Sequence, residues 1–110
     1  MMQNNLSNNT CAPCNGNTPV INAVEANELL KNLPGWILSA DGKSMHKEFK
    51  SVDFAEGLAF TNKVGALAES QNHHPDILLA WGKVTVTLWT HAIGGLSMND
   101  FILASKIETL

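Results

Sequence analysis

Basic residues are scarce in this chain of 110 amino acids, which holds seven Lys and Arg against ten Asp and Glu. A surface that binds nucleic acid needs clustered cations, so a formal net charge of -3 argues against that class of protein. No apolar run approaches the roughly 18 residues of a membrane-spanning helix. The opening MMQNNLSNNT lacks the basic start and the apolar stretch of a secretory signal. We therefore expect a soluble, cytoplasmic protein with no nucleic-acid or membrane partner.

Cysteine is also scarce, and Cys11 and Cys14 form one C-x-x-C. A redox motif of this kind opens a helix after a strand, because the helix N-terminus lowers a thiol pKa, and the surrounding Asn, Pro and Gly predict no such helix. A zinc site needs two further ligands, but the sequence has no second C-x-x-C. We interpret the pair as incidental and residues 1–20, which are polar and aperiodic, as a disordered extension.

Residues 21–110 have the patterns of a single folded domain, in a chain that is 45% hydrophobic. Helical spacing and capping signals predict three helices, and alternation around turn dipeptides predicts two hairpins. The predicted helices are 25–33, 53–72 and 98–109, and the predicted strands are 36–39, 44–50, 76–80 and 83–90. The order α-β-β-α-β-β-α predicts an α+β fold, a four-stranded antiparallel sheet with three helices on one face.

Three of the four histidines fall at two junctions of this predicted order. His73 and His74 come where the long helix ends, and His91 comes where the last strand ends. If strand 76–80 pairs antiparallel with strand 83–90, the start of one lies opposite the end of the other. The hairpin therefore predicts that the three imidazoles meet at one edge of the sheet.

Imidazoles give and take protons near neutral pH, so a group of them suits acid–base catalysis. Asp100, at the start of the last helix, can orient one of them as a carboxylate does in hydrolytic triads. Purely structural roles compete with this interpretation, since Asp100 can be a helix cap and the histidines can be polar ends of elements. His46 lies on the polar side of its strand and is given no role. We expect no metal, because the i, i+4 pair of helical metal sites is absent.

The run Glu69–Pro75 (ESQNHHP), followed by Trp81, His91 and Asp100, resembles the signature of the pterin-4a-carbinolamine dehydratases. That signature has a charged residue, three spacers, His-His-Pro, an aromatic residue, a further His and a later Asp. Every position is filled here at acceptable spacing. The Leu-Pro-Gly-Trp sequence and the stretch VTVTLWTHAIGGLSMNDFILASKIE are also similar to the family. The resemblance covers roughly residues 24–109 and leaves out the N-terminal extension.

This resemblance implies a four-stranded antiparallel sheet that assembles as a homo-oligomer, either a dimer or a tetramer. It implies a hydro-lyase that dehydrates 4a-hydroxytetrahydrobiopterin, or a related pterin, to the quinonoid dihydropterin. That substrate is a product of aromatic amino acid hydroxylases, which places the reaction in tetrahydrobiopterin recycling. The resemblance implies neither a metal nor an organic cofactor. Its substrate contacts map to His73, His74, Pro75, Thr90, His91, Ala92 and Ile93.

From the chemistry of the substrate, we expect His73 and His91 to form the acid–base pair. His74 is expected to hold the pterin, and Asp100 to orient His91. Two other classes of function stay open. Some members of the family act as a dimerisation cofactor for a transcription factor, which they meet through a helical surface. The third class is an accessory protein in molybdopterin metabolism, or one that supports a phenylalanine hydroxylase.

Overall fold

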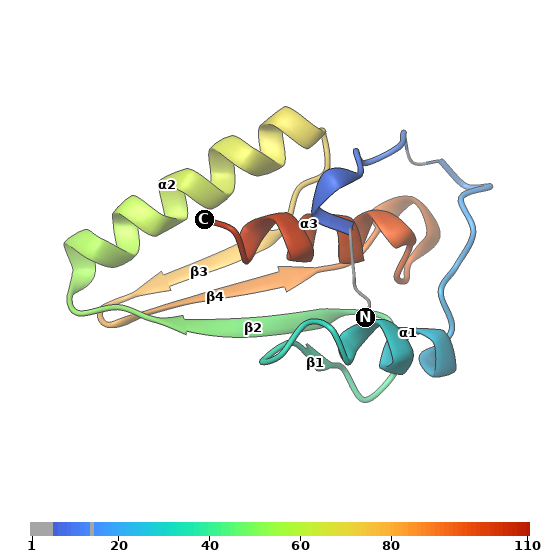
Figure 1. Cartoon of the computed structure of the whole chain (residues 1–110), viewed down its shortest axis with the longest axis horizontal. Coiled ribbons are helices and arrows are strands. Elements are labelled where there is room, and N and C mark those ends of the chain that lie inside the picture. The colour runs from blue at the N-terminus through green and yellow to red at the C-terminus, as the bar shows by residue number, and fades with distance from the viewer. Residues whose placement is uncertain (1–5, 14) are drawn as a thin grey trace.

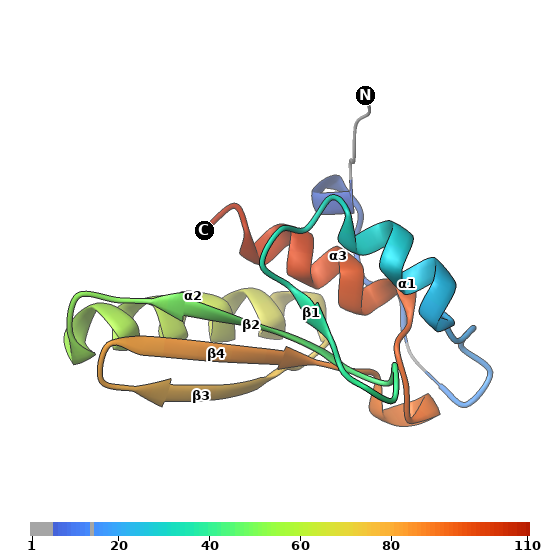
Figure 2. The ribbon, with the colours of Figure 1, turned by 90° about the horizontal axis from the view of Figure 1, so that it is seen from below.

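The computed structural model describes residues 6–13 and 15–110, and within them three α-helices and four strands follow in the predicted order (Figures 1 and 2). These elements are α1 (Ala23–Leu30), β1 (Ile37–Leu38), β2 (Met45–Lys50), α2 (Phe54–Gln71), β3 (Asp76–Ala80), β4 (Lys83–Leu88) and α3 (Met98–Ile107). Two 3-10 turns are η1 (Leu6–Asn8) and η2 (His91–Ile93).

The four strands form one antiparallel sheet in the order β1-β2-β4-β3. Helices α2 and α3 lie above it in the view of Figure 1. Helix α1 packs on the same side, because its Ala26 belongs to the buried cluster that holds Val64 of α2 and Phe101 of α3. The predicted α+β class is therefore confirmed. In the β3–β4 hairpin Asp76 pairs with Thr87, so the start of β3 lies beside the end of β4. This register places the segment that follows α2 next to the segment that follows β4.

The core lies between the sheet and the helices. Val84, Val86 and Leu88 on one face of β4 are buried, and they pack in one cluster with Met45 of β2 and Phe101 of α3. The alternate positions of β4 are half-buried or exposed, as expected for a sheet covered on one face. Burial of this apolar surface, at about 25 cal/mol per Å², holds the helices on the sheet. Among the described residues, no helix is long and apolar enough to cross a membrane.

The long helix α2 ends before its proline is reached. Asn72 takes a left-handed conformation with φ 52° and ψ 39°, which Asn tolerates better than most residues. Its N–H caps the helix, and the N–H of His73 donates to the carbonyl of Ala68. His73 therefore lies just beyond the helix, with its N–H still bonded to the last turn.

Strand β4 stops two residues earlier than the alternating pattern predicts. Its last residue is Leu88, and the N–H of Thr90 donates to the carbonyl of Gly95 at 2.7 Å, which closes a small loop. Gly94 takes a φ of 59°, a conformation that glycine adopts without steric cost, and so lets the chain turn back. His91 consequently begins η2 instead of ending a strand.

Of the extension expected to be disordered, residues 1–5 and 14 lie outside the described residues, whereas residues 6–13 contact the folded domain. Leu6 and Cys11 pack against the hydrophobic core, and η1 lies beside α3 (Figure 1). The side chain of Asn99 in α3 also exchanges two hydrogen bonds with the backbone of Ala12. The Asn-rich composition predicted disorder because it offers few apolar residues for a core. Composition does not reveal that backbone groups and two scattered apolar side chains find partners on the folded domain.

Candidate functional site

A hollow of about 220 Å³ lies where the chain leaves α2 and where it leaves β4. Its lining includes three imidazoles, so we call it the histidine hollow. It is formed by Asn72, His73, His74, Trp89, Thr90, His91 and Ala92. The register of the β3–β4 hairpin brings these two segments together, as the sequence predicted. The volume is below the roughly 300–1,000 Å³ of pockets for drug-sized ligands and suits a small molecule.

His73 forms a buried polar contact behind the hollow. Its Nε2 lies 2.7 Å from Oδ1 of Asp100, and both residues are buried. An ionised carboxylate only accepts hydrogen bonds, so in this pair Nε2 carries the hydrogen. Asp100 thus orients His73, and the expectation that it orients His91 is wrong.

The second oxygen of Asp100 is held just as closely. Oδ2 accepts from Oγ1 of Thr90 at 2.7 Å and from the backbone N–H of Ser97 at 2.9 Å. The hydroxyls of Thr90 and Ser97 lie 2.7 Å apart. A buried carboxylate is costly unless its oxygens accept hydrogen bonds, and these contacts supply them. Asp100 therefore has two roles. It caps the start of α3, and it is the partner of His73.

The alternation of side chains after β4 explains why Asp100 reaches His73 and not His91. Thr90 points inward and is buried, while its neighbour His91 is exposed. Successive side chains of an extended chain point to opposite sides. Thr90 therefore contacts Asp100, while Trp89 and His91 on either side of it point away. The sequence named Thr90 only as a substrate contact, and its bond to Asp100 and that of Ser97 were missed.

Trp89 and His91 share the outer side of this segment and stack on each other. Their ring centroids are 3.9 Å apart, with an interplanar angle of 30°. The indole N–H of Trp89 also donates to Oδ2 of Asp76 at 3.4 Å. The structure places Trp89 against His91 in the lining of the hollow. Its spacing of two residues from His91 was the signal for a shared face.

His74 has its own carboxylate partner. Its Nε2 lies 2.7 Å from Oε1 of Glu69, the charged residue that opens the motif. Both side chains are largely exposed, at 56% and 80%. A solvated pair of this kind contributes little to stability, so its effect is to set the direction of the imidazole.

Some residues of the motif lie outside the hollow. Pro75 and Ile93 were expected to contact the substrate, but neither lines it. Ile93 instead borders a separate depression together with Ile21. Trp81, the aromatic residue of the motif, is 73% exposed between β3 and β4, at the end of the hairpin away from His73. The hairpin that joins the histidines therefore separates this tryptophan from them.

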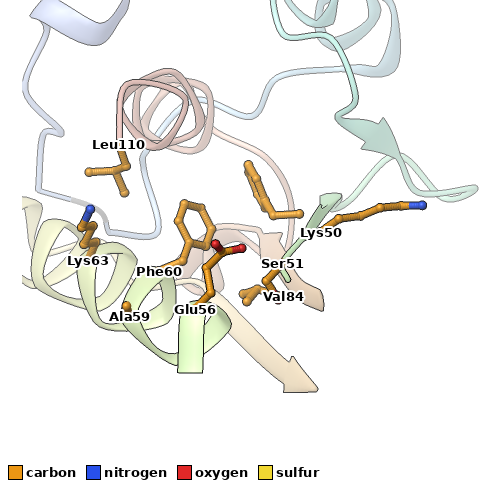
Figure 3. Close-up of a pocket in the computed structure, with 9 residues that line it drawn as sticks. Lys50, Ser51, Glu56, Ala59, Phe60, Lys63, Val84 and Leu110 are labelled. Atoms are coloured by element: carbon orange, nitrogen blue, oxygen red, sulfur yellow. The ribbon is translucent and has the colours of Figure 1, made fainter. Parts of the chain in front are cut away.

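A larger hollow of about 290 Å³ lies between β2 and α2 (Figure 3). Aromatic and aliphatic side chains line it, together with charged groups that include Glu56 and Lys63. No histidine lines it. Its lining includes Ser51, whose Oγ is the one buried side-chain oxygen or nitrogen among the described residues without a hydrogen-bond partner. Without a group suited to proton exchange near neutral pH, this hollow does not compete with the histidine hollow for acid–base chemistry.

No group of three or more His, Cys, Asp or Glu side chains is arranged to hold a metal ion within residues 6–13 and 15–110. Sγ of Cys11 lies 3.6 Å from the carbonyl oxygen of Asn99. Cys14 lies outside the described residues, so the interpretation of the C-x-x-C as incidental stays a prediction.

The chain is similar to known proteins in sequence and in structure. Residues 19–110 match the family model Pterin 4 alpha carbinolamine dehydratase. A protein of Chlorobaculum tepidum, provisionally named a pterin-4-alpha-carbinolamine dehydratase, is 46% identical over 107 residues, which cover 96% of each chain. A similarly named protein of Rubrobacter xylanophilus is 42% identical over 105 residues, covering 96% of this chain and 97% of its own.

Among solved structures, the crystal structure of a transcriptional coactivator/pterin dehydratase from Brucella melitensis is similar to this one, with a TM-score of 0.78. The two sequences are 31% identical, and the match covers 83% of this chain and 97% of the other. The two bacterial relatives align over 96% of the chain and so reach into the first 20 residues, which the motif resemblance left out. With a family model over residues 19–110 and relatives of this identity, the chain belongs to the pterin-4a-carbinolamine dehydratase family.

Proposed function

We propose that this chain catalyses the dehydration of a 4a-hydroxytetrahydropterin to the quinonoid dihydropterin, by histidine acid–base chemistry. The observation that carries the proposal is the convergence of His73, His74 and His91 on one hollow, with the buried carboxylate of Asp100 behind His73. Membership of the family and the names of the relatives support the same reaction.

The reaction requires two proton transfers and no change of oxidation state. The bond from C4a to the hydroxyl oxygen breaks, and that oxygen gains a proton to leave as water. The N5–H proton is removed, and its electron pair forms the C4a=N5 double bond. A general acid and a general base, each contributing about 10²–10⁴-fold, meet these needs.

His73 suits the role of the base. Its Nε2 lies against Asp100, and in the tautomer that has the hydrogen on Nε2 the lone pair of the ring is on Nδ1. The carboxylate of Asp100 also stabilises the imidazolium that forms when the ring takes the N5 proton. His91, which is exposed and stacked on Trp89, suits the acid that protonates the leaving hydroxyl, because it can exchange protons with solvent.

His74 then holds the pterin, with its ring directed by Glu69. We further propose 4a-hydroxytetrahydrobiopterin as the substrate, in recycling of the cofactor of an aromatic amino acid hydroxylase. The family resemblance supports this assignment and a mechanism without a metal or organic cofactor. Assembly as a homo-dimer or tetramer and a cytoplasmic location stay predictions.

A stopped-flow assay of 4a-hydroxytetrahydropterin dehydration tests the proposal. The wild-type chain should accelerate the reaction over buffer. His73→Ala and His91→Ala should each lower kcat by about 10²–10⁴-fold, while His74→Ala should mainly raise KM. His46→Ala is the matched control, because His46 lies on β2 and does not line the hollow.

Two results would contradict the proposal. If the wild-type chain does not accelerate the dehydration over buffer, it does not have the proposed activity. Acceleration that survives both His73→Ala and His91→Ala leaves the activity but moves it away from the histidine hollow.

A second candidate function is regulatory protein binding, which the name of the Brucella melitensis structure favours by joining a coactivator to a dehydratase. The outer side of α2 exposes Phe54 and Leu58, 45% and 43% respectively, at the spacing of one helical turn. Co-purification from the native host with wild type, His73→Ala and Phe54→Glu separates the two functions. A partner retained by His73→Ala and lost by Phe54→Glu supports binding independent of catalysis.

A further inference from the structure

The N-terminal segment spans helix α3 and reaches the end of α2. At one end, Nζ of Lys106 donates to the carbonyl oxygen of Ser7 at 2.8 Å. At the other end, the side-chain amide of Asn99 accepts from the N–H of Ala12 at 2.9 Å and donates to its carbonyl oxygen at 2.6 Å. Figure 1 shows this dark-blue segment beside α3, close to the end of α2. The segment is therefore attached near both ends of α3.

Cys11 extends this attachment to a second helix. Its N–H donates to Oε1 of Gln71, the last residue of α2, at 3.1 Å. Its sulfur lies 3.6 Å from the carbonyl oxygen of Asn99, the second residue of α3. Two consecutive residues, Cys11 and Ala12, thus bond to the end of one helix and the start of another.

The two helix ends that this segment joins carry the buried pair of the histidine hollow. Gln71 precedes His73 by two residues, and Asn99 comes directly before Asp100. Since His73 and Asp100 belong to different elements, their 2.7 Å contact depends on the distance between those ends. Asn99 is itself buried, so its amide cannot exchange these bonds for water without moving the segment.

We propose that the peptide of Cys11 and Ala12 is a clasp that positions the His73–Asp100 pair, with Gln71 and Asn99 as its positioning residues. This rests on the proposed function, because it concerns the geometry of the proposed base. The clasp keeps Nε2 of His73 against Asp100 and so selects the tautomer in which Nδ1 is basic.

The test compares Asn99→Ala, which removes both bonds to Ala12, with Gln71→Leu, which removes the acceptor for Cys11. Each should lower kcat by about tenfold, less than the roughly 10²-fold cost of a 1 Å misplacement, with KM changed by less than about twofold. Gln71→Glu keeps an oxygen acceptor and should stay within about twofold of wild type. Lys106→Met releases only the far end of the segment and is the control for a general loss of stability.

An activity-independent measurement accompanies the kinetics. The ¹⁵N chemical shifts of the His73 ring report which nitrogen carries the hydrogen. Wild type, Lys106→Met and Gln71→Glu should show the Nε2–H form, while Asn99→Ala and Gln71→Leu should show a mixture of tautomers. This readout remains valid if the chain proves inactive, so failure of the clasp and failure of the proposed function give different results.

The proposal is overturned if Asn99→Ala and Gln71→Leu lower only the melting temperature and leave kcat and the His73 tautomer as in wild type. It is also overturned if Lys106→Met lowers kcat as much as they do, since the effect would then be general. If Asn99→Ala does not fold, Gln71→Leu decides alone, because Gln71 is only partly buried.

Discussion

His73 and Asp100 are 27 residues apart in the sequence, and their side chains meet at 2.7 Å in the structure. One follows α2 and the other lies in the first turn of α3. The carboxylate is completely buried and accepts two more hydrogen bonds, from Thr90 and Ser97. Asp100 thus connects the segment after α2, the segment after β4 and the start of α3, so its substitution is the most informative.

Asp100→Asn should lower kcat of the proposed dehydration by about 10²–10⁴-fold, because an amide that donates toward His73 favours the wrong tautomer. It should also lower the free energy of unfolding by about 1–3 kcal/mol, since a buried donor replaces a charged acceptor. Steady-state kinetics and urea unfolding measure the two effects. A variant that loses stability but keeps the kcat of wild type would reduce Asp100 to a helix cap.

Trp89→Leu should lower kcat by about 2- to 10-fold, because the stacked ring that sets the direction of His91, the proposed acid, is lost. Trp89→Phe keeps an aromatic ring in that place and should remain within about twofold of wild type. Initial rates over a range of pterin concentrations separate KM from kcat. Equal kcat values for the Leu and Phe variants would show that the stacking has no part in orienting His91.

Glu108→Ala should destabilise the fold by about 1–3 kcal/mol and leave kcat unchanged. Oε2 of Glu108 accepts from the indole N–H of Trp36 at 3.0 Å, and both carboxylate oxygens lie within 2.9 Å of Nζ of Lys47. These side chains are only partly exposed, so the contacts are less screened than those of a surface pair. Urea unfolding measures the loss, and Glu108→Gln, which keeps an acceptor for Trp36, should lose less. Loss of activity in a folded Glu108→Ala would contradict the separation of this contact from the hollow.

The hydrogen bonds of Asp41, in the turn of the first hairpin, predict that the free energy of unfolding depends on pH. Hydrogen bonds from Oγ of Ser39 and from the N–H of Lys43 lower the pKa of the Asp41 carboxyl below its ordinary value of 3.8. Because the folded-state pKa is the lower one, the stabilisation is complete well above pH 3.8 and is lost as the pH falls through the folded value. The gap in unfolding free energy between wild type and Asp41→Asn should therefore close on acidification. A gap that stays constant from about pH 6 to about pH 2 would contradict this.

Periodicity and turn chemistry in the sequence predicted most of the fold. The β3–β4 hairpin could be placed from alternation, and its pairing then required that the segments with His73 and His91 meet. The ends of elements were less predictable. Asn72 ends α2 by adopting a left-handed conformation, and Thr90 leaves β4 to pair with Gly95. Both depend on backbone conformations that no period of hydrophobicity encodes.

The partner of Asp100 was the main error in the expected site. The sequence offers three imidazoles, of which His91 is the nearest to Asp100 in the chain, and only the direction of each side chain in the folded protein selects His73. The N-terminal segment was missed for a related reason, since its contacts with Gln71 and Asn99 are made mostly by backbone groups, which every sequence contains. Sequence patterns report which side chains are apolar, whereas these contacts depend on where peptide groups lie.

The sequence alone determined the α+β order and the gathering of three histidines at one sheet edge, because side-chain periodicity and hairpin pairing are local rules that the chain carries in its residues. The tertiary structure decided which imidazole meets the buried carboxylate of Asp100, which tryptophan stacks on His91, and that residues 11 and 12 join α2 to α3. Those outcomes depend on distances between elements far apart in the chain, and packing fixes such distances only when the whole core is assembled.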